Sequence, residues 1–145
     1  MRTINQADLA VRLRLAIART ARRLRQEAGE ELSPSQTAAL ATIDRHGPLT
    51  PSELAVRERI QRPTVTRIVA LLEERGLVQR TRDPQDGRSS LVALTPAGRD
   101  LLARGRTRKD AYLARRLREL DGQERATLQR AAAILERLLE EEGGR

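Results

Sequence analysis

The sequence has no cysteine, no phenylalanine and no tryptophan, and its one aromatic residue is Tyr112. Without cysteine, the chain has no disulfide framework, no thiolate metal site and no thiol-based redox sensor. Its core must be built from Leu, Ile, Val and Ala, which favour helices when they occur in long amphipathic segments. The chain has no apolar run of about 18 residues and its N-terminus is charged, so we predict no membrane span and no signal peptide. We expect a cytoplasmic protein.

Residue types that support catalysis are also scarce. His46 is the single histidine, and with no neighbouring metal-binding side chain it is predicted to be an exposed residue near a helix C-terminus. The sequence has no glycine-rich phosphate loop and no repeated carboxylate constellation. We therefore predict no catalytic residue, no metal site and no cofactor, and a protein that is not an enzyme.

Basic residues outnumber acidic ones by 28 to 20, which gives a formal net charge of +8. An excess of this size fits a polyanionic partner such as nucleic acid. All basic residues except Lys109 are arginine. That preference can reflect genome composition, so only the net charge supports the interpretation.

A long amphipathic helix is predicted over residues 5–28, because apolar residues recur there at helical spacing. The stripe consists of Leu9, Leu13, Ile17, Ala21 and Leu24. At 1.5 Å per residue this helix is about 35 Å long, more than one small domain covers, so part of it is expected to pack on a second subunit. The alternative is a solvated helix whose basic face contains Arg12, Arg19, Arg22 and Arg23.

Two helix-start signals then follow in the middle of the chain. Residues 33–36 form a capping box with proline at the first helical position, and that helix ends at Gly47. Residues 50–53 repeat the signal, and Ile60 is expected to fill a turn before a further helix over residues 62–75. Its buried face is predicted to be Val65, Ile68, Val69 and Leu72. This order is typical of a helix-turn-helix.

The buried face determines which side chains of the 62–75 helix point outward. The outward or N-terminal positions are Gln61, Arg62, Pro63, Thr64, Thr66 and Arg67. An arginine there can bind guanine through two hydrogen bonds, and threonine can contact a thymine methyl group or a phosphate. The acidic residues Glu73 and Glu74 lie at the far end. We therefore predict a recognition helix for DNA; the alternative is a surface helix with incidental polarity.

A β-hairpin is predicted over residues 77–94, with dense turn residues at 83–87. Because an isolated hairpin is marginally stable, we expect Leu77, Leu91 and Leu94 to anchor it on the helical core. Arg82 and Arg88 at its tip are expected to enter a minor groove. Two carboxylates, Asp83 and Asp86, are expected to hold the arginine and brace the turn.

Two more helices are predicted at the C-terminal end. One follows Thr95 and reaches about Leu120, and the next begins at a capping box over residues 121–124. The last helix has an apolar stripe of Leu128, Ala131, Leu135, Leu138 and Leu139. Together with Leu9, Leu13 and Ile17, this stripe is predicted to form a homodimer interface. The alternative is a monomeric bundle that closes on itself.

Residues 33–95 resemble the DNA-binding region of the MarR family of bacterial transcription regulators. The residues that carry the resemblance are 62–67, the helix exit 73–78, and the wing pattern Asp83-Pro84-x-Asp86-x-Arg88. The implied fold is mainly α with a small β-hairpin wing, a winged helix-turn-helix flanked by N- and C-terminal dimerisation helices. One MarR-like domain would span 1–145, with a DNA-binding lobe at 33–95 and a helical dimerisation region at 1–30 and 96–145.

The resemblance also implies function. It implies a sequence-specific regulator of double-stranded DNA, a homodimeric repressor on palindromic operators, released by a small-molecule effector of unknown identity. Effectors of the family are commonly aromatic or phenolic, and we expect an aliphatic pocket here because aromatic residues are nearly absent. The alternative function is a non-specific architectural DNA-binding protein or a helical interaction protein without ligand response, for which basic helices would suffice.

Overall fold

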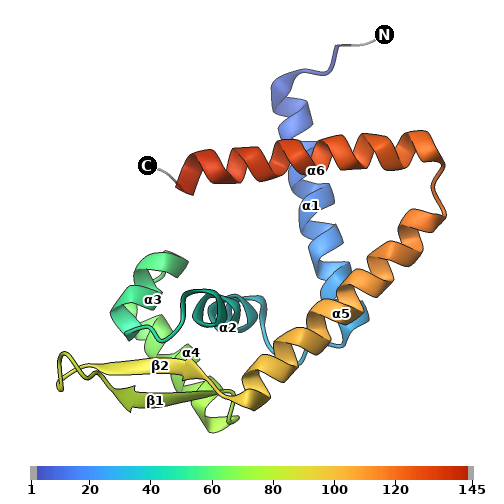
Figure 1. The fold of residues 1–145 in the computed structure, drawn as a ribbon. Coiled ribbons are helices and arrows are strands. Elements are labelled where there is room, and N and C mark those ends of the chain that lie inside the picture. The colour runs from blue at the N-terminus through green and yellow to red at the C-terminus, as the bar shows by residue number, and fades with distance from the viewer. Residues whose placement is uncertain (1–2, 144–145) are drawn as a thin grey trace.

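The computed structural model describes residues 3–143 and contains six α-helices and one two-stranded sheet (Figure 1). The elements in chain order are α1 (Gln6–Ala28), α2 (Pro34–His46), α3 (Pro51–Glu58), α4 (Arg62–Glu74), β1 (Val78–Arg82), β2 (Ser90–Leu94), α5 (Pro96–Arg118) and α6 (Gly122–Gly143). The predicted fold class, mainly α with a β-hairpin wing, is confirmed.

Side-chain caps fix the helix starts where the sequence predicted them. Ser33 Oγ accepts from the Gln36 amide at 3.2 Å, while Gln36 Oε1 accepts from the Ser33 amide at 3.0 Å. The side chains of Thr50 and Thr95 cap α3 and α5 by accepting from the amides three residues on, those of Glu53 and Gly98. Each cap satisfies amides that have no partner inside the helix, so these sequences favour a helix start at one defined residue.

The core lies between α2, α3, α4 and the hairpin, in the part of the molecule that we call the reader lobe (residues 33–95). The four residues predicted as the buried face of α4 are all buried, and they pack with Leu40, Ile43 and Leu54. On α2, Ala39 is buried in this core, while its neighbour Ala38 is exposed. The described charged side chains all stay outside this core.

The hairpin is antiparallel, with Val78 opposite Leu94 and Arg80 opposite Val92. Leu91 was predicted to anchor the hairpin, and this was wrong: Leu91 is partly exposed and Val92 is fully buried. Side chains alternate between the two faces of a strand, so Val92 and Leu94 face the core and Leu91 does not. Leu49 adds a short third segment, exchanging backbone hydrogen bonds of 3.0 and 2.7 Å with Val92.

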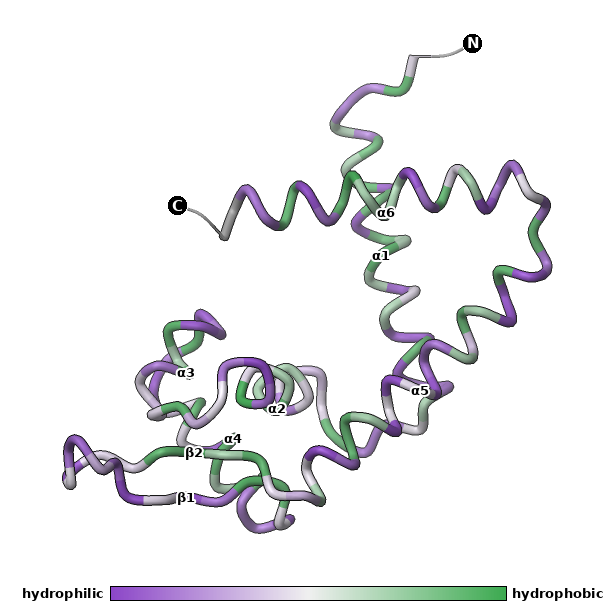
Figure 2. The backbone as a smooth tube through the Cα atoms, in the orientation of Figure 1, coloured by the Kyte–Doolittle hydropathy of each residue, from purple (hydrophilic) through white to green (hydrophobic). Residues whose placement is uncertain are grey.

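The terminal helices form a separate part of the molecule, which we call the stalk (α1, α5 and α6). α5 leaves the end of β2, runs away from the reader lobe and packs along α1 before the chain turns into α6 (Figure 1). Green apolar and purple polar segments alternate along α6 in Figure 2. The described part of the stalk does not close into a bundle, since Leu138 and Leu139 remain 52% and 71% exposed. None of the described helices is long and apolar enough to cross a membrane.

Candidate nucleic-acid interface

Helices α3 and α4 form the helix-turn-helix, and its turn depends on one unusual residue. Arg59 adopts a left-handed conformation with φ of 55°, which lets the chain leave α3 sharply. The amides of Arg59 and Ile60 donate back to carbonyls of the last turn of α3, and Ile60 packs against the core. Ile60 therefore fills the turn as predicted. The Arg62 guanidinium also donates to Ser52 Oγ and ties the start of α4 to the start of α3.

The N-terminal half of α4 presents the predicted recognition residues to solvent. Five of the six are exposed, namely Gln61, Arg62, Pro63, Thr66 and Arg67, while Thr64 is half-buried. The hydroxyl of Thr66 donates to the Arg62 carbonyl at 3.0 Å. Arg67 makes no ion pair or side-chain hydrogen bond within residues 3–143, so its guanidinium is available to a ligand.

The wing turn is held by its two aspartates. Asp83 Oδ1 accepts from the Gln85 amide at 2.9 Å, and Asp86 Oδ1 accepts from the Arg88 amide at 3.0 Å. The Ser89 hydroxyl donates to Asp86 Oδ2 at 3.4 Å. The two carboxylates were also predicted to hold an arginine side chain. In the described structure they bind turn amides and a hydroxyl instead, because the turn brings those donors closer.

Both predicted wing arginines, Arg82 and Arg88, are exposed near the tip, and neither forms an ion pair with a described residue. On β1, two residues before Arg82, the Nε of Arg80 lies 3.3 Å from a Glu73 carboxylate oxygen. That ion pair joins the wing to the end of α4. Arg82 and Arg88 have no such partner among the described residues, whereas the ion pair of Arg80 stabilises the reader lobe.

Sequence reasoning missed three residues that shape this surface. Ser52 receives the Arg62 bond, Arg59 makes the turn, and Leu49 extends the sheet. No sequence signal indicates Arg59, because arginine is not a residue that favours the left-handed region. His46 is exposed as predicted, and its Nε2 lies 3.2 Å from Arg57 Nη1.

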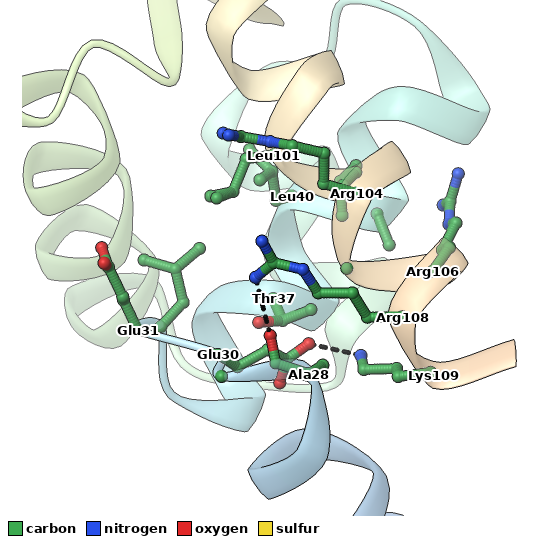
Figure 3. Close-up of a pocket in the computed structure, with 15 residues that line it drawn as sticks. Ala28, Glu30, Glu31, Thr37, Leu40, Leu101, Arg104, Arg106, Arg108 and Lys109 are labelled. Carbon is green, nitrogen blue, oxygen red and sulfur yellow. Dashed lines mark hydrogen bonds and ion pairs between the residues drawn. The ribbon is translucent and has the colours of Figure 1, made fainter. Parts of the chain in front are cut away.

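A second feature is a cavity of about 400 Å³ between the end of α1, α2 and α5, which we call the junction cavity (Figure 3). Arg108 donates to the Ala28 carbonyl at 3.2 Å, and Lys109 pairs with the largely buried carboxylate of Glu30. The second oxygen of Glu30, Oε2, is buried without a hydrogen-bond partner. Leu32, Leu40, Leu101 and Leu102 supply the apolar lining.

The cavity has aliphatic and no aromatic lining residues, in line with the expectation of an aliphatic pocket, but the expectation did not include the charged side chains beside them. Charged side chains form much of the wall, namely Glu30, Glu31, Arg104, Arg106, Arg108 and Lys109. In the sequence, α5 contains a strongly basic stretch from Arg104 to Arg118. Helical geometry turns part of that stretch toward the end of α1, where the chain offers a carbonyl and a carboxylate as partners.

The predicted dimerisation residues lie on the stalk. The most exposed are Leu9, Leu13, Ile17, Leu128, Leu138 and Leu139, while Leu135 is half-buried. Val11 and Leu15, on the other side of α1, and Ile134 of α6 are also exposed and were not predicted. α1 therefore presents apolar side chains on two faces, a pattern typical of a helix that is covered on both sides.

A helix-turn-helix followed by a β-hairpin, with free arginines on the second helix and at the hairpin tip, defines a winged helix-turn-helix protein. Comparison with known proteins gives the family. The model of the MarR family matches residues 32–90. An uncharacterized HTH-type transcriptional regulator of Mycobacterium bovis is 38% identical over 138 residues, covering 94% of this chain and 96% of the relative. The chain belongs to the MarR family.

Solved structures agree over 95% of the chain. A transcriptional regulator of Pseudomonas aeruginosa is 36% identical with a TM-score of 0.83, over 95% of this chain and 98% of that one. A MarR family protein of Bacillus stearothermophilus is 25% identical with a TM-score of 0.79, over 95% and 99% of the two chains. The protein is therefore a helix-turn-helix transcriptional regulator, and regulators of this family are not enzymes.

Proposed function

We propose that the protein is a homodimeric repressor that binds palindromic operators in double-stranded DNA. The observation that carries the proposal is the outward side of the N-terminal half of α4, which is exposed and free of acidic residues and on which Arg67 has no ion pair with a described residue. A recognition helix reads base edges in the major groove from this end, where a carboxylate would be repelled by phosphates.

Individual contacts follow from side-chain chemistry. Arg67 reads guanine through two hydrogen bonds, and Thr64 or Thr66 contacts a thymine methyl group or a phosphate. Gln61 and Pro63 lie at the edge of α4 that approaches the sugar-phosphate backbone of the DNA. Because Arg62 already donates to Ser52, it positions α3 against α4 and adds positive charge near the phosphates.

The wing supplies a second contact. Arg82 and Arg88 enter the adjacent minor groove, where narrow A·T-rich stretches concentrate negative potential. Asp83 and Asp86 do not contact DNA in this scheme. They brace the turn through its own amides, which fixes the position of the two arginines.

Dimerisation is proposed from the stalk, because its exposed leucines and isoleucines have no cover in the described chain. In this division of the single domain, residues 33–95 bind DNA and residues 1–30 and 96–145 dimerise. A twofold axis through the stalk would place the two α4 helices in successive major grooves, roughly 34 Å apart. Operators are then palindromic, and the stalk determines the half-site spacing.

We assign a small-molecule effector, of unknown identity, to the junction cavity. The cavity touches the end of α1, α2 and α5, so it lies where the reader lobe joins the stalk. A ligand that binds one arrangement of lobe and stalk more tightly than the other shifts the separation of the two α4 helices, and operator affinity with it.

Selection of genomic fragments by the purified protein tests this function, because it returns both the operator and the neighbouring genes. Recovered fragments should share an inverted repeat, and the protein should bind it at least about a thousandfold more tightly than random DNA of equal length at the same salt concentration. Equal binding to both, with a steep salt dependence, would instead identify a non-specific architectural protein.

A further inference from the structure

The turn between α3 and α4 contains Arg59, the one non-glycine residue with positive φ among residues 3–143. Its φ of 55° and ψ of 42° lie in the left-handed helical region, in which the Cβ of an L-amino acid comes too close to the following carbonyl oxygen. Its amide donates to the carbonyls of Ala55 and Val56 and closes the last turn of α3. The fold therefore needs a left-handed residue at this position, but it does not need an arginine.

Elsewhere the chain makes the same kind of helix end with glycine. Gly29 ends α1 with φ of 64° and ψ of 36°, and its amide also donates to the carbonyls three and four residues before it. The other described residues with positive φ, Gly47 and Gly76, are glycines as well. Glycine adopts these angles without strain, whereas strained non-glycine residues cluster at functional sites. The side chain of Arg59 is therefore a candidate for function.

The fold itself gives that side chain no partner. Arg59 is exposed, and it forms no ion pair and no side-chain hydrogen bond with a described residue. The two nearest arginines differ from it. Arg57 Nη1 lies 3.2 Å from His46 Nε2. The Arg62 guanidinium donates to Ser52. Of these three arginines around the turn, only Arg59 has a guanidinium with no partner in the described chain.

The position of Arg59 places it beside the proposed DNA interface. It precedes Gln61, the N-cap of α4, by two residues. Because consecutive Cα atoms are 3.8 Å apart, its Cα lies within about 7.6 Å of the end of the helix that enters the major groove. The acidic residue next to it in the sequence, Glu58, is half-buried and already accepts from the Thr42 hydroxyl on α2. A guanidinium at this place is within reach of the phosphates that border the groove.

We propose that Arg59 binds a DNA phosphate from the turn between α3 and α4. The contact rests on the proposed function and adds a residue to it. A phosphate contact positions the recognition helix but carries no sequence information, so it contributes equally to the binding of operator and of random DNA. Each homodimer has two such contacts, one from each turn.

Substitutions that keep the turn and change the charge test the contact. Arg59→Gly and Arg59→Asn remove the cation, and both new residues tolerate the left-handed conformation. Each variant should bind the recovered inverted repeat and random DNA about tenfold or more weakly than the wild type at low salt. The slope of log K against log salt should become shallower by about 0.9 for each lost phosphate contact, or about 1.8 for a dimer. Arg59→Lys should keep the wild-type slope, because it keeps the charge.

Two controls separate the contact from other effects. Denaturant unfolding should show that Arg59→Gly is at least as stable as the wild type, because glycine relieves the left-handed strain. Weaker DNA binding by this variant is then not a result of unfolding. The matched control Arg75→Asn removes an exposed positive charge at the other end of α4 and should leave the salt slope unchanged.

Wild-type affinity and slope in both Arg59→Gly and Arg59→Asn would overturn the contact. Equal losses in Arg59→Asn and Arg75→Asn would also overturn it, since net charge alone would then explain them, and so would a loss in Arg59→Lys as large as that in Arg59→Asn. A loss confined to the repeat would replace the phosphate contact by a base contact. Equal binding of the wild type to the repeat and to random DNA would overturn the proposed function instead, while weaker binding of Arg59→Asn to random DNA would still support the contact.

Discussion

Gly98 lies so close to the backbone of Leu77 that a Cβ at position 98 would be 2.1 Å from the Leu77 carbonyl oxygen. The Thr95 amide donates to this same oxygen at 3.1 Å, and the Thr95 hydroxyl donates to the Gly76 carbonyl at 2.6 Å. The first turn of α5 is therefore fixed to the start of the wing. This joint links the first turn of α5 to the reader lobe.

Replacement of Gly98 by alanine should destabilise the protein by about 1 to 3 kcal/mol, because the added methyl group meets backbone that cannot move freely. Denaturant unfolding of the two proteins measures the difference. Gly105→Ala on the same helix is the control, since a Cβ there meets nothing within 4 Å. It should be neutral or stabilising by up to about 1 kcal/mol. Equal effects of the two substitutions would contradict the close contact.

Arg67→Ala should remove discrimination at one base pair of each half-site, about 1 to 3 kcal/mol, because the bidentate contact is lost. Gel-shift titrations against single-base operator variants measure it. Arg75→Ala removes the same charge from the other end of the recognition helix and should leave base preference unchanged. Unaltered base preference in Arg67→Ala would mean that the outward face of α4 is wrongly assigned.

Arg88→Ala should weaken operator binding by about 1.5 to 3 kcal/mol, the range for a hydrogen bond to a charged group. The dimer should be unaffected, because the wing tip lies in the reader lobe. Fluorescence anisotropy with labelled operator measures the affinity, and sedimentation measures the dimer. Arg118→Ala, an exposed arginine at the end of α5, is the charge-matched control. Wild-type affinity of Arg88→Ala would remove the wing from the mechanism.

Leu138→Asp should abolish the dimer and operator binding together, since it places a charge in the proposed interface. The fold of the chain should survive, because Leu138 is 52% exposed in the single chain. Val56→Asp is the matched control: Val56 is 78% exposed on α3 of the reader lobe. Sedimentation velocity should show a monomer for Leu138→Asp and a dimer for Val56→Asp, and two dimers would refute the assigned interface.

Local signals account for what the sequence predicted well. Caps such as Ser33 and Thr50 fix helix starts through bonds within a few residues, and the spacing of the four buried residues of α4 fixes its outward face. The errors concern relations between distant residues. Strand alternation alone does not tell which of Leu91 and Val92 faces the core, because that depends on where α2 packs.

The charged lining of the junction cavity could not be predicted for the same reason. From the sequence, Lys109 belongs to a basic stretch, and nothing near it indicates that Glu30, 79 residues away, lies beside it. The left-handed conformation of Arg59 could not be predicted either, because it is imposed by the packing of α3 on α4 and not by the backbone preference of arginine. Candidate DNA contacts could be predicted because the position of each on the helix or hairpin follows from local periodicity.

The most direct test of the account is the binding of purified protein to a recovered inverted repeat, to a single half-site and to random DNA, all at one salt concentration. We predict that two chains bind the repeat, at least about a thousandfold more tightly than random DNA, and that the half-site binds much more weakly. Equal affinity for the three DNAs would contradict the central claim that paired α4 helices read a palindromic sequence.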